Sequence, residues 1–202
     1  MARAALAAGA KLPYRVRMEI RAATSADRDA IWNIFHEIVA AGDTYAFDPN
    51  VSRAEALAYW FRTDTHTYVA EIHRQSVGQA VGFPRTATPS PTVGTKDWGI
   101  AGTYILRPNQ SGPGSHIANA AFMVTSNAQG SGVGGAMAEH CLSEARRMGF
   151  RAMQFNFVVS TNMPAIHLWK QFGFEIVGTL PGAFRHPEKG YVDVYIMFRS
   201  LL

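Results

Sequence analysis

The chain has 202 residues, of which 48% are hydrophobic and 17% charged, a composition typical of a folded globular protein and not of a disordered one. The formal net charge is +4 with no long basic run, which suits an anionic ligand but does not indicate nucleic-acid binding. No apolar run approaches the roughly 20 residues of a membrane-spanning helix, and the single cysteine, Cys141, excludes an intramolecular disulfide. We therefore expect a cytoplasmic protein with no membrane partner.

The predicted elements alternate as in one mixed α/β domain. Residues 1–17 are rich in Ala and Arg and contain no acid, so we predict a flexible extension ahead of a single domain over 18–202. Prolines interrupt residues 73–97 and 178–190, which are predicted to be irregular. Helical periodicity predicts helices within 24–42, 52–62, 133–148 and 164–172. Apolar runs predict strands at 16–21, 67–72, 100–106, 116–124, 151–159, 174–177 and 191–198.

A glycine-rich run joins the strand at 116–124 to the helix that follows it. Glycines let a backbone approach a ligand closely, and the free N–H groups at a helix start attract a phosphate. Gly130, Gly132 and Gly135 also fit the dinucleotide pattern G-x-G-x-x-G. However, the first glycine lies several residues beyond the strand, and the next strand lacks the terminal acid that binds a ribose. We therefore expect a phosphate-bearing cofactor on main-chain donors, with a simple tight helix entry as the alternative.

Two motifs resemble those of one enzyme family. Residues Gln129 to Gly134 read QGSGVG and are similar to the Q/R-x-x-G-x-G/A loop with which GNAT N-acetyltransferases bind the acetyl-CoA pyrophosphate. Residues 162–174, NMPAIHLWKQFGF, are similar to the second signature of that family. The resemblance covers residues 18–199 and implies an α/β fold, the GNAT (acyl-CoA N-acyltransferase) fold. This fold has a mixed central sheet with splayed strands 4 and 5, flanked by helices.

The resemblance also implies a direct transfer from acetyl-CoA to an amine, with no metal. Main-chain N–H near Met123 or Val124 would hold the thioester oxygen as charge builds on it. Asn162 would contact the pantetheine arm and also cap a helix. Many members place a Tyr, as acid for the thiolate, where this chain has Trp169; an indole is a poor acid, so Trp169 is expected to pack against cofactor or core. The expected cofactor-binding residues are Met123, Val124, Gln129, Gly130, Gly132, Val133, Gly134, Gly135, Asn162 and Trp169.

The segments expected to bind the acetyl acceptor resemble those of two subfamilies. The loop TYAFDPNVS, with Tyr45 and Phe47 expected to wall the acceptor pocket, is similar to that of phosphinothricin-type amino-acid acetyltransferases. Those enzymes carry a Glu where this chain has Asn119, which cannot take a proton. The stretches AGTYILRPN, SHIANAAFMV and FNFVVSTN resemble fungal azetidine-2-carboxylate acetyltransferases, whose asparagines match Asn119, Asn156 and Asn162. Asn119 and Asn156 are therefore the catalytic candidates, and the acceptor is expected to be an amino acid or analogue.

The sequence leaves the general base and the catalytic activity open. His116 lies near Asn119 and carries an imidazole, a side chain that often acts as a general base, but strand alternation places it on the opposite face. Glu71 could act through water, although a solvated edge carboxylate is the simpler interpretation. Without the Tyr and the Glu, the chain could instead be a non-catalytic acyl-CoA-binding or sensor module on the same fold. The histidines show no metal-ligand spacing, and the resemblance does not decide between a monomer and a homodimer.

Overall fold

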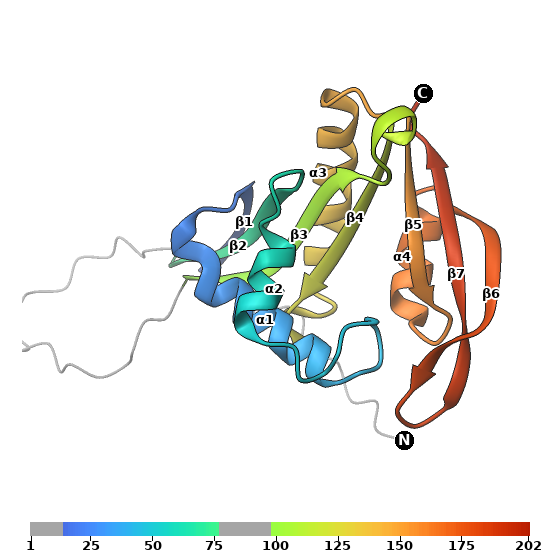
Figure 1. Cartoon of the computed structure of the whole chain (residues 1–202). Helices are drawn as coiled ribbons and strands as arrows, with labels where there is room; N and C mark the ends of the chain where they lie inside the picture. The colour runs from blue at the N-terminus through green and yellow to red at the C-terminus, as the bar shows by residue number, and fades with distance from the viewer. Residues whose placement is uncertain (1–13, 77–97) are drawn as a thin grey trace, which may run out of the picture.

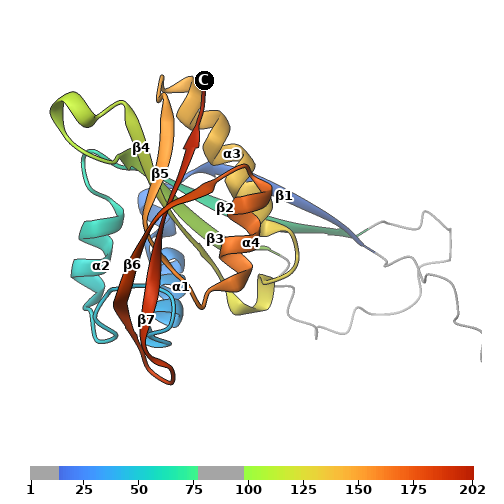
Figure 2. The ribbon, with the colours of Figure 1, turned by 90° about the vertical axis from the view of Figure 1, so that its right-hand side faces the viewer.

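A central sheet is covered by a layer of helices on each of its two faces. The computed structural model describes residues 14–76 and 98–202, and its seven strands form one sheet in the order β1-β2-β3-β4-β5-β7-β6. Figures 1 and 2 show helices α1 and α2 on one face of this sheet and α3 and α4 on the other. The strands are β1 (Tyr14–Ala22), β2 (His66–Ser76), β3 (Trp98–Pro108), β4 (Ile117–Val124), β5 (Ala152–Val159), β6 (Glu175–His186) and β7 (Gly190–Ser200). The helices are α1 (Arg28–Ala40), α2 (Arg53–Trp60), α3 (Val133–Arg147) and α4 (Met163–Gln171).

The central strands β4 and β5 are parallel but separate after a short contact. They pair only at Ile117 with Ala152 and at Ala118 with Met153. Beyond these pairs β4 continues along β3, whereas β5 continues along β7. The two strands therefore diverge, as Figure 1 shows, and the predicted mixed sheet with splayed strands 4 and 5 is confirmed. No helix within residues 14–76 or 98–202 is long and apolar enough to cross a membrane.

Several of the sequence-based element boundaries are wrong. Residues 73–76, which were predicted to be irregular, continue β2. Residues 178–190 are not a loop, because β6 continues to His186 and only a tight turn joins it to β7. Pro181 is accommodated because β6 is an edge strand bonded to β7 alone, and its register shifts between Leu180 and Phe184. At the other end, β1 begins at Tyr14, before the predicted strand start at residue 16, and pairs with the last residues of β2. The remainder of the predicted extension, 1–13, and residues 77–97 lie outside the described residues.

The core has one part under each helical layer. Below α1 and α2, the side chain of Trp60 is fully buried, and its indole N–H donates to the Thr103 hydroxyl at 3.0 Å. On the other face, α3 buries its apolar stripe against the sheet, with Cys141 fully enclosed. Burial raises the pKa of the Cys141 thiol well above its ordinary value. Cys141 is therefore an inert core residue, as its position on the inner face of the helix predicts.

The start of α1 is held by a buried carboxylate. The predicted capping box is present, with the main-chain N–H of Thr24 donating to Asp27 Oδ2 at 2.7 Å. The guanidinium of Arg21 donates to both oxygens of Asp27, at 2.8 and 2.9 Å, and to Glu71 at 3.0 Å. This guanidinium is the main reason why the pKa of Asp27 falls from 3.8 to about 2. Arg21 of β1 thus links the ionised Asp27, at the start of α1, to Glu71 of β2.

Asp27→Asn is expected to lower the free energy of unfolding by about 2 kcal/mol at pH 7. Because the pKa of Asp27 is lower in the folded state, its contribution is complete above pH 4 and disappears as the pH falls toward 2. Urea unfolding at pH 7 and pH 2 measures both values. Asp64→Asn, which removes the exposed ion pair of Asp64 with Arg62 at 2.9 Å, is the control and should change neither. An equal loss for Asp27→Asn at both pH values would contradict this account.

Candidate active site

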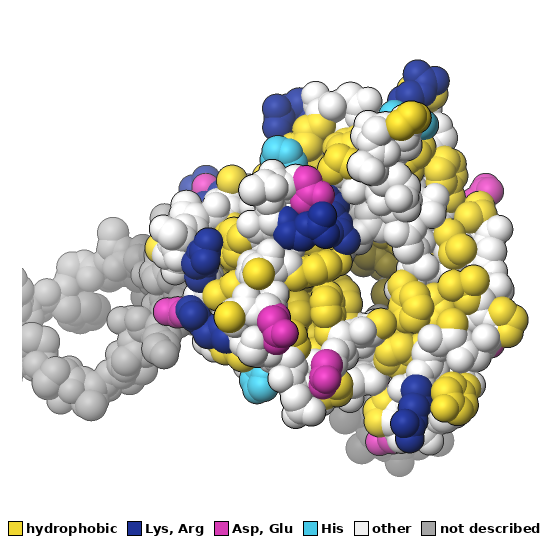
Figure 3. All heavy atoms as spheres, in the orientation of Figure 1, with side chains coloured by type: hydrophobic (Ala, Val, Ile, Leu, Met, Phe, Trp, Pro, Cys, Tyr) yellow, Lys and Arg dark blue, Asp and Glu magenta, His cyan; other side chains and the backbone are white. Residues whose placement is uncertain are grey.

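The divergence of β4 and β5 opens a cleft of about 990 Å³. Figure 3 shows it as a hollow between the part of the molecule that contains α2 and β3 and the part that contains β5 to β7, with hydrophobic side chains gathered on its walls. Its lining comes from the loop after α1, β4, the glycine loop, β5, the start of α4 and the β6–β7 turn. The volume and the mixed lining fit an extended ligand with a second, smaller one beside it.

The main chain of β4 has one edge bonded to β3 and one edge open to the cleft. Toward β3, the carbonyl of Ile117 accepts from Asn109 N–H at 2.7 Å, and Thr125 N–H donates to the carbonyl of Ala101 at 2.9 Å. Since the N–H and C=O groups of a strand alternate in direction, the odd-numbered residues of β4 face β3. The even-numbered residues therefore direct their N–H and C=O groups toward β5 at Ala118, where the two strands pair, and into the cleft beyond it.

This alternation separates the two residues that were expected to hold the thioester. Val124 directs its N–H into the cleft, and so does Phe122, which the sequence analysis did not consider. Met123 directs its N–H toward β3, opposite Thr103. The side chain of Met123 is almost completely buried, although one edge of it lines the cleft. The main-chain N–H groups that face the cleft are therefore those of Phe122 and Val124, and not that of Met123.

The glycine loop presents open main chain to the cleft. Gly130 and Gly132 have φ values of 73° and 87°, a region that side chains other than that of glycine rarely adopt. A Cβ at Gly130, Gly132 or Gly135 would meet nothing within 4 Å, so space for a ligand lies beside them. Gln129 and Gly134 line the same part of the cleft. The side chain of Val133 differs, because it is buried in the core; only its N–H, at the first position of α3, remains for a ligand.

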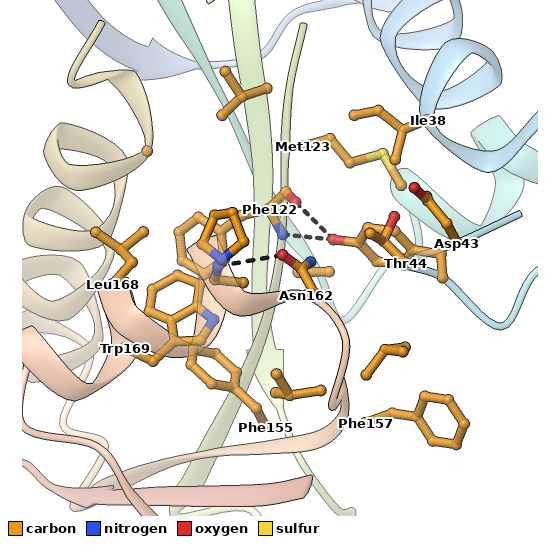
Figure 4. Close-up of a pocket in the computed structure, with 18 of the residues that line it drawn as sticks. Ile38, Asp43, Thr44, Phe122, Met123, Phe155, Phe157, Asn162, Leu168 and Trp169 are labelled. Atoms are coloured by element: carbon orange, nitrogen blue, oxygen red, sulfur yellow. Dashed lines mark hydrogen bonds between the residues drawn. The ribbon is translucent and has the colours of Figure 1, made fainter. Parts of the chain in front are cut away.

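Helix α4 brings two further predicted residues to the cleft. Asn162 caps the helix, with Oδ1 accepting from Ala165 N–H at 3.2 Å, and it lines the cleft as well. Trp169 packs its ring 4.8 Å from Phe122 and 4.6 Å from Phe155, between centroids. Figure 4 shows Trp169 on the α4 side of Phe122 and the loop residues beyond α1 on the other side. The structure thus supports a packing role for Trp169.

Two predicted catalytic residues meet at the end of the cleft where β4 and β5 separate. The Asn119 amide, on β4, donates to the main-chain carbonyl of Gln154 on β5 at 2.8 Å. Asn156, also on β5, donates to the side-chain oxygen of Asn109 at 2.6 Å and accepts from the Gln154 side chain at 2.8 Å. Both asparagines line the cleft. Their arrangement provides amide groups for orienting a small polar ligand but no proton acceptor of a base's strength.

The loop after α1 forms the opposite wall. The hydroxyl of Tyr45 donates to the carbonyl of Phe122 at 2.6 Å and accepts from its N–H at 3.1 Å; the dashed lines between Phe122 and the loop in Figure 4 mark these bonds. Desolvation raises the pKa of the Tyr45 phenol, which therefore stays protonated. Phe47 packs 5.0 Å from both Phe35 and Tyr59, between ring centroids. Both predicted wall residues line the cleft.

The candidate bases of the sequence analysis lie elsewhere. Glu71 is engaged by Arg21 at 3.0 Å on the β1–β2 side of the sheet and does not line the cleft. His116 lies just before β4, with Nδ1 3.0 Å from the carbonyl of Pro113, and also lies outside the lining. Within residues 14–76 and 98–202, no group of three or more His, Cys, Asp or Glu side chains is arranged to hold a metal ion.

Arg107 is a site residue that the sequence analysis missed. It stands near the end of β3, lines the cleft, and donates to the hydroxyl of Tyr59 at 2.8 Å. Its guanidinium carbon also lies 4.9 Å from the centre of the Tyr59 ring, so ring and hydroxyl together orient it. Lys189 and Asp43 are the other charged residues of the lining. The sequence could have indicated this residue, because the arginine follows the apolar strand residues AGTYIL and a charged side chain at the end of a buried strand has to contact solvent or a cavity.

Comparisons with known proteins identify the family. The profile described as Acetyltransferase (GNAT) family matches residues 29–174. The chain belongs to this family. The N-acetyltransferase aca1 of Schizosaccharomyces pombe (strain 972 / ATCC 24843) is 31% identical over 163 residues, which cover 78% of this chain and 72% of aca1. The recognition made from the two motifs is confirmed, and the dinucleotide-binding alternative is excluded.

Solved structures agree with this assignment. A GCN5-related N-acetyltransferase from Kribbella flavida has a TM-score of 0.75 and 38% identity, with coverage of 91% of this chain and 97% of that protein. The phosphinothricin acetyltransferase (Pat) from Sinorhizobium meliloti, solved in complex with AcCoA, has a TM-score of 0.69 and 18% identity, with coverage of 91% and 88%. The first supports the family and the second the fold. The chain is thus an N-acetyltransferase of the GNAT family.

Proposed function

We propose that this N-acetyltransferase moves the acetyl group of acetyl-CoA to the amine of a small acceptor that carries a carboxylate, an amino acid or amino-acid analogue. The observation that carries the acceptor class is Arg107, a guanidinium oriented in the cleft by Tyr59 and opposite Asn119 in the pairing of β3 with β4. The donor class rests on family membership and on the open glycine loop at the other end of the cleft.

The cleft accommodates acetyl-CoA along the open edge of β4. Its pyrophosphate would lie on the N–H groups at the start of α3, where the left-handed Gly130 and Gly132 let the main chain approach. Its pantetheine arm would then follow the free N–H and C=O groups of β4, past Asn162. The even-numbered residues of β4 supply N–H donors for the arm and for the thioester oxygen as negative charge develops on it.

The acceptor would bind at the end of β4 farthest from the glycine loop. A guanidinium has five N–H donors, and Arg107 uses one of them on Tyr59, so others remain for a carboxylate. The charged lining also favours an anion, because among the described residues it contains Arg107 and Lys189 but one carboxylate, that of Asp43. Asn119 and Asn156 would orient the amine by hydrogen bonds. The acceptor would thereby be held at both of its polar groups.

The chemistry needs little from titratable side chains. The neutral amine attacks the thioester carbon, a C–N bond forms, and the C–S bond breaks to release CoA. The proton lost from nitrogen balances the thiolate, whose thiol pKa near 8.5 makes it an adequate leaving group without a protein acid. This is consistent with an asparagine at position 119 and a tryptophan at 169. The protein contributes mainly by orienting the two reactants and stabilising the developing charge.

Acetyl transfer is tested by the release of CoA thiol with matched acceptor pairs. The pairs are azetidine-2-carboxylate with azetidine, and proline with pyrrolidine, so that each differs only in the carboxylate; methionine sulfoximine and phosphinothricin represent primary amines. We expect turnover with at least one carboxylated acceptor and little with its partner. Arg107→Met should lower kcat/KM for the carboxylated acceptor by about thirtyfold or more, because it removes one partner of a charge pair.

The control is Arg185→Met, which removes an exposed arginine of β6 outside the cleft lining and should leave kcat/KM unchanged. Equal turnover of both members of each pair would contradict a carboxylate-bearing acceptor but leave the acetyl transfer intact. No thiol release with any acceptor, despite measurable binding of acetyl-CoA, would contradict a small-molecule acceptor of this class.

A further inference from the structure

The phenol of Tyr45 occupies a position on β4 that a thioester would need. Its oxygen lies 3.1 Å from the main-chain nitrogen of Phe122 and 2.6 Å from the carbonyl oxygen. Both groups of Phe122 belong to the open edge of β4. A strand partner could bond here, but a side chain 77 residues away in the sequence does so instead. Tyr45 therefore forms hydrogen bonds with both main-chain groups of Phe122, in the middle of this edge.

If acetyl-CoA lies along the open edge of β4, as proposed above, its thioester would lie near Phe122. The glycine loop follows the last residue of β4, Val124, so the pyrophosphate end of acetyl-CoA lies beyond that residue. Asn119, at the acceptor end, lies near the start of the strand. At about 3.3 Å per residue, Phe122 lies about 7 Å from Val124 along the way to Asn119. The reacting carbon has to lie between the arm and the acceptor, which would bring the thioester oxygen to the N–H of Phe122, two residues before Val124.

We propose that the Tyr45 hydroxyl and the thioester oxygen compete for the main-chain N–H of Phe122, so that Tyr45 has to release Phe122 when acetyl-CoA binds, but not when CoA binds. The inference rests on the proposed use of acetyl-CoA in this cleft. A thioester oxygen needs to come within about 3 Å of a donor nitrogen, and the phenol oxygen already occupies that space. CoA has no carbonyl at its sulfur, so it leaves the two bonds of Tyr45 in place.

The exchange resets the site after each transfer. When the acetyl group has moved to the acceptor, CoA no longer offers an oxygen to Phe122, and the phenol returns to its two hydrogen bonds. The loop that carries Tyr45 stays anchored through Phe47, which packs against Phe35 and Tyr59. Only the Tyr45 side chain has to move. The hydroxyl that is bonded to Phe122 is protonated, because desolvation raises its pKa.

The test compares the affinities for acetyl-CoA and CoA in Tyr45→Phe by titration calorimetry. The variant keeps the ring, which lies 6.0 Å from Phe47 between centroids, but removes the hydroxyl that competes for Phe122. The ratio of acetyl-CoA affinity to CoA affinity should rise about fivefold over the wild-type ratio. Tyr59→Phe is the matched control. It removes another hydroxyl of the cleft lining, one that contacts Arg107 and not β4, so it should leave the ratio unchanged.

An unchanged or lower ratio in Tyr45→Phe would overturn the proposal, because the hydroxyl would then not compete with the thioester. The wild-type protein provides a second measurement that does not depend on a variant. The amide resonance of Phe122 should shift with acetyl-CoA and hardly at all with CoA; equal shifts would also overturn the proposal. Failure of the wild type to bind either ligand is a different result, which would contradict the cofactor site itself.

Discussion

Gly132→Trp is expected to lower the affinity for acetyl-CoA by at least about a hundredfold. Gly132 precedes α3, has a φ of 87°, and has open space beside its Cα where the pyrophosphate would lie. An indole in that space would keep the phosphates away from the N–H groups of the helix start. Hydrogen bonds to a charged group contribute about 1.5–3 kcal/mol each, so the loss of two accounts for the expected effect. Calorimetric titration with acetyl-CoA measures it.

Gly149→Trp is the matched control for backbone strain. Gly149 follows the other end of α3, has a φ of 84°, and also has nothing within 4 Å of its Cβ position, but it does not line the cleft. Any side chain in this left-handed conformation costs about 1–2 kcal/mol, so both variants should be destabilised alike. Only Gly132→Trp should lose acetyl-CoA. If both variants bind acetyl-CoA as the wild type does, the glycine loop is not the phosphate site.

Asn119→Ala is expected to lower kcat/KM for the acceptor by about thirtyfold, with the acetyl-CoA dissociation constant changed by less than about twofold. The side chain joins β4 to β5 where they separate, through its bond to the carbonyl of Gln154 at 2.8 Å, and it lines the acceptor end of the cleft. Alanine leaves that carbonyl unpaired and removes the amide that would orient the amine. The pyrophosphate loop lies at the other end of β4, so the affinity for acetyl-CoA should hardly change.

Initial rates of thiol release over a range of acceptor concentrations, with a separate acetyl-CoA titration, resolve the two effects of Asn119→Ala. Asn33→Ala, at an exposed position of α1 outside the cleft lining, is the control and should match the wild type in both measurements. Unchanged turnover in Asn119→Ala would remove Asn119 from the mechanism. A loss of acetyl-CoA affinity as large as the loss of turnover would instead show that its bond across the two strands shapes the whole cleft.

Features that depend only on residues close together in the sequence were predictable from the sequence alone. Gly130 and Gly132 adopt left-handed φ values that only glycine takes readily, so the loop is recognisable wherever it stands. Asn162 caps α4 through Ala165, three residues on, and the capping box that starts at Thr24 is equally local. The periodicity of apolar residues located the helices and most of the strands. These local signals, with the two motifs, were sufficient for the fold and the family.

Strand boundaries at the margins of the sheet were not predictable in this way. The extent of β6 depends on its place at the edge, where Pro181 needs no partner for a missing N–H. The start of β1 depends on how far β2 extends beside it, as the pairing of Tyr14 with Ser76 shows. Both properties belong to a pair of strands and not to either segment alone.

The acceptor end of the cleft was decided by contacts between distant segments. Tyr45 meets Phe122 across 77 residues, and Arg107 is oriented by Tyr59 across 48. Which edge of β4 remains open depends on its pairing with β3, which directs the N–H of Met123 away from the cleft and those of Phe122 and Val124 into it. The amino-acid sequence specifies which functional groups the protein has, because each side chain's chemistry is fixed by its covalent structure. Only packing and strand register decide which of these groups face one another, because both depend on how distant segments meet.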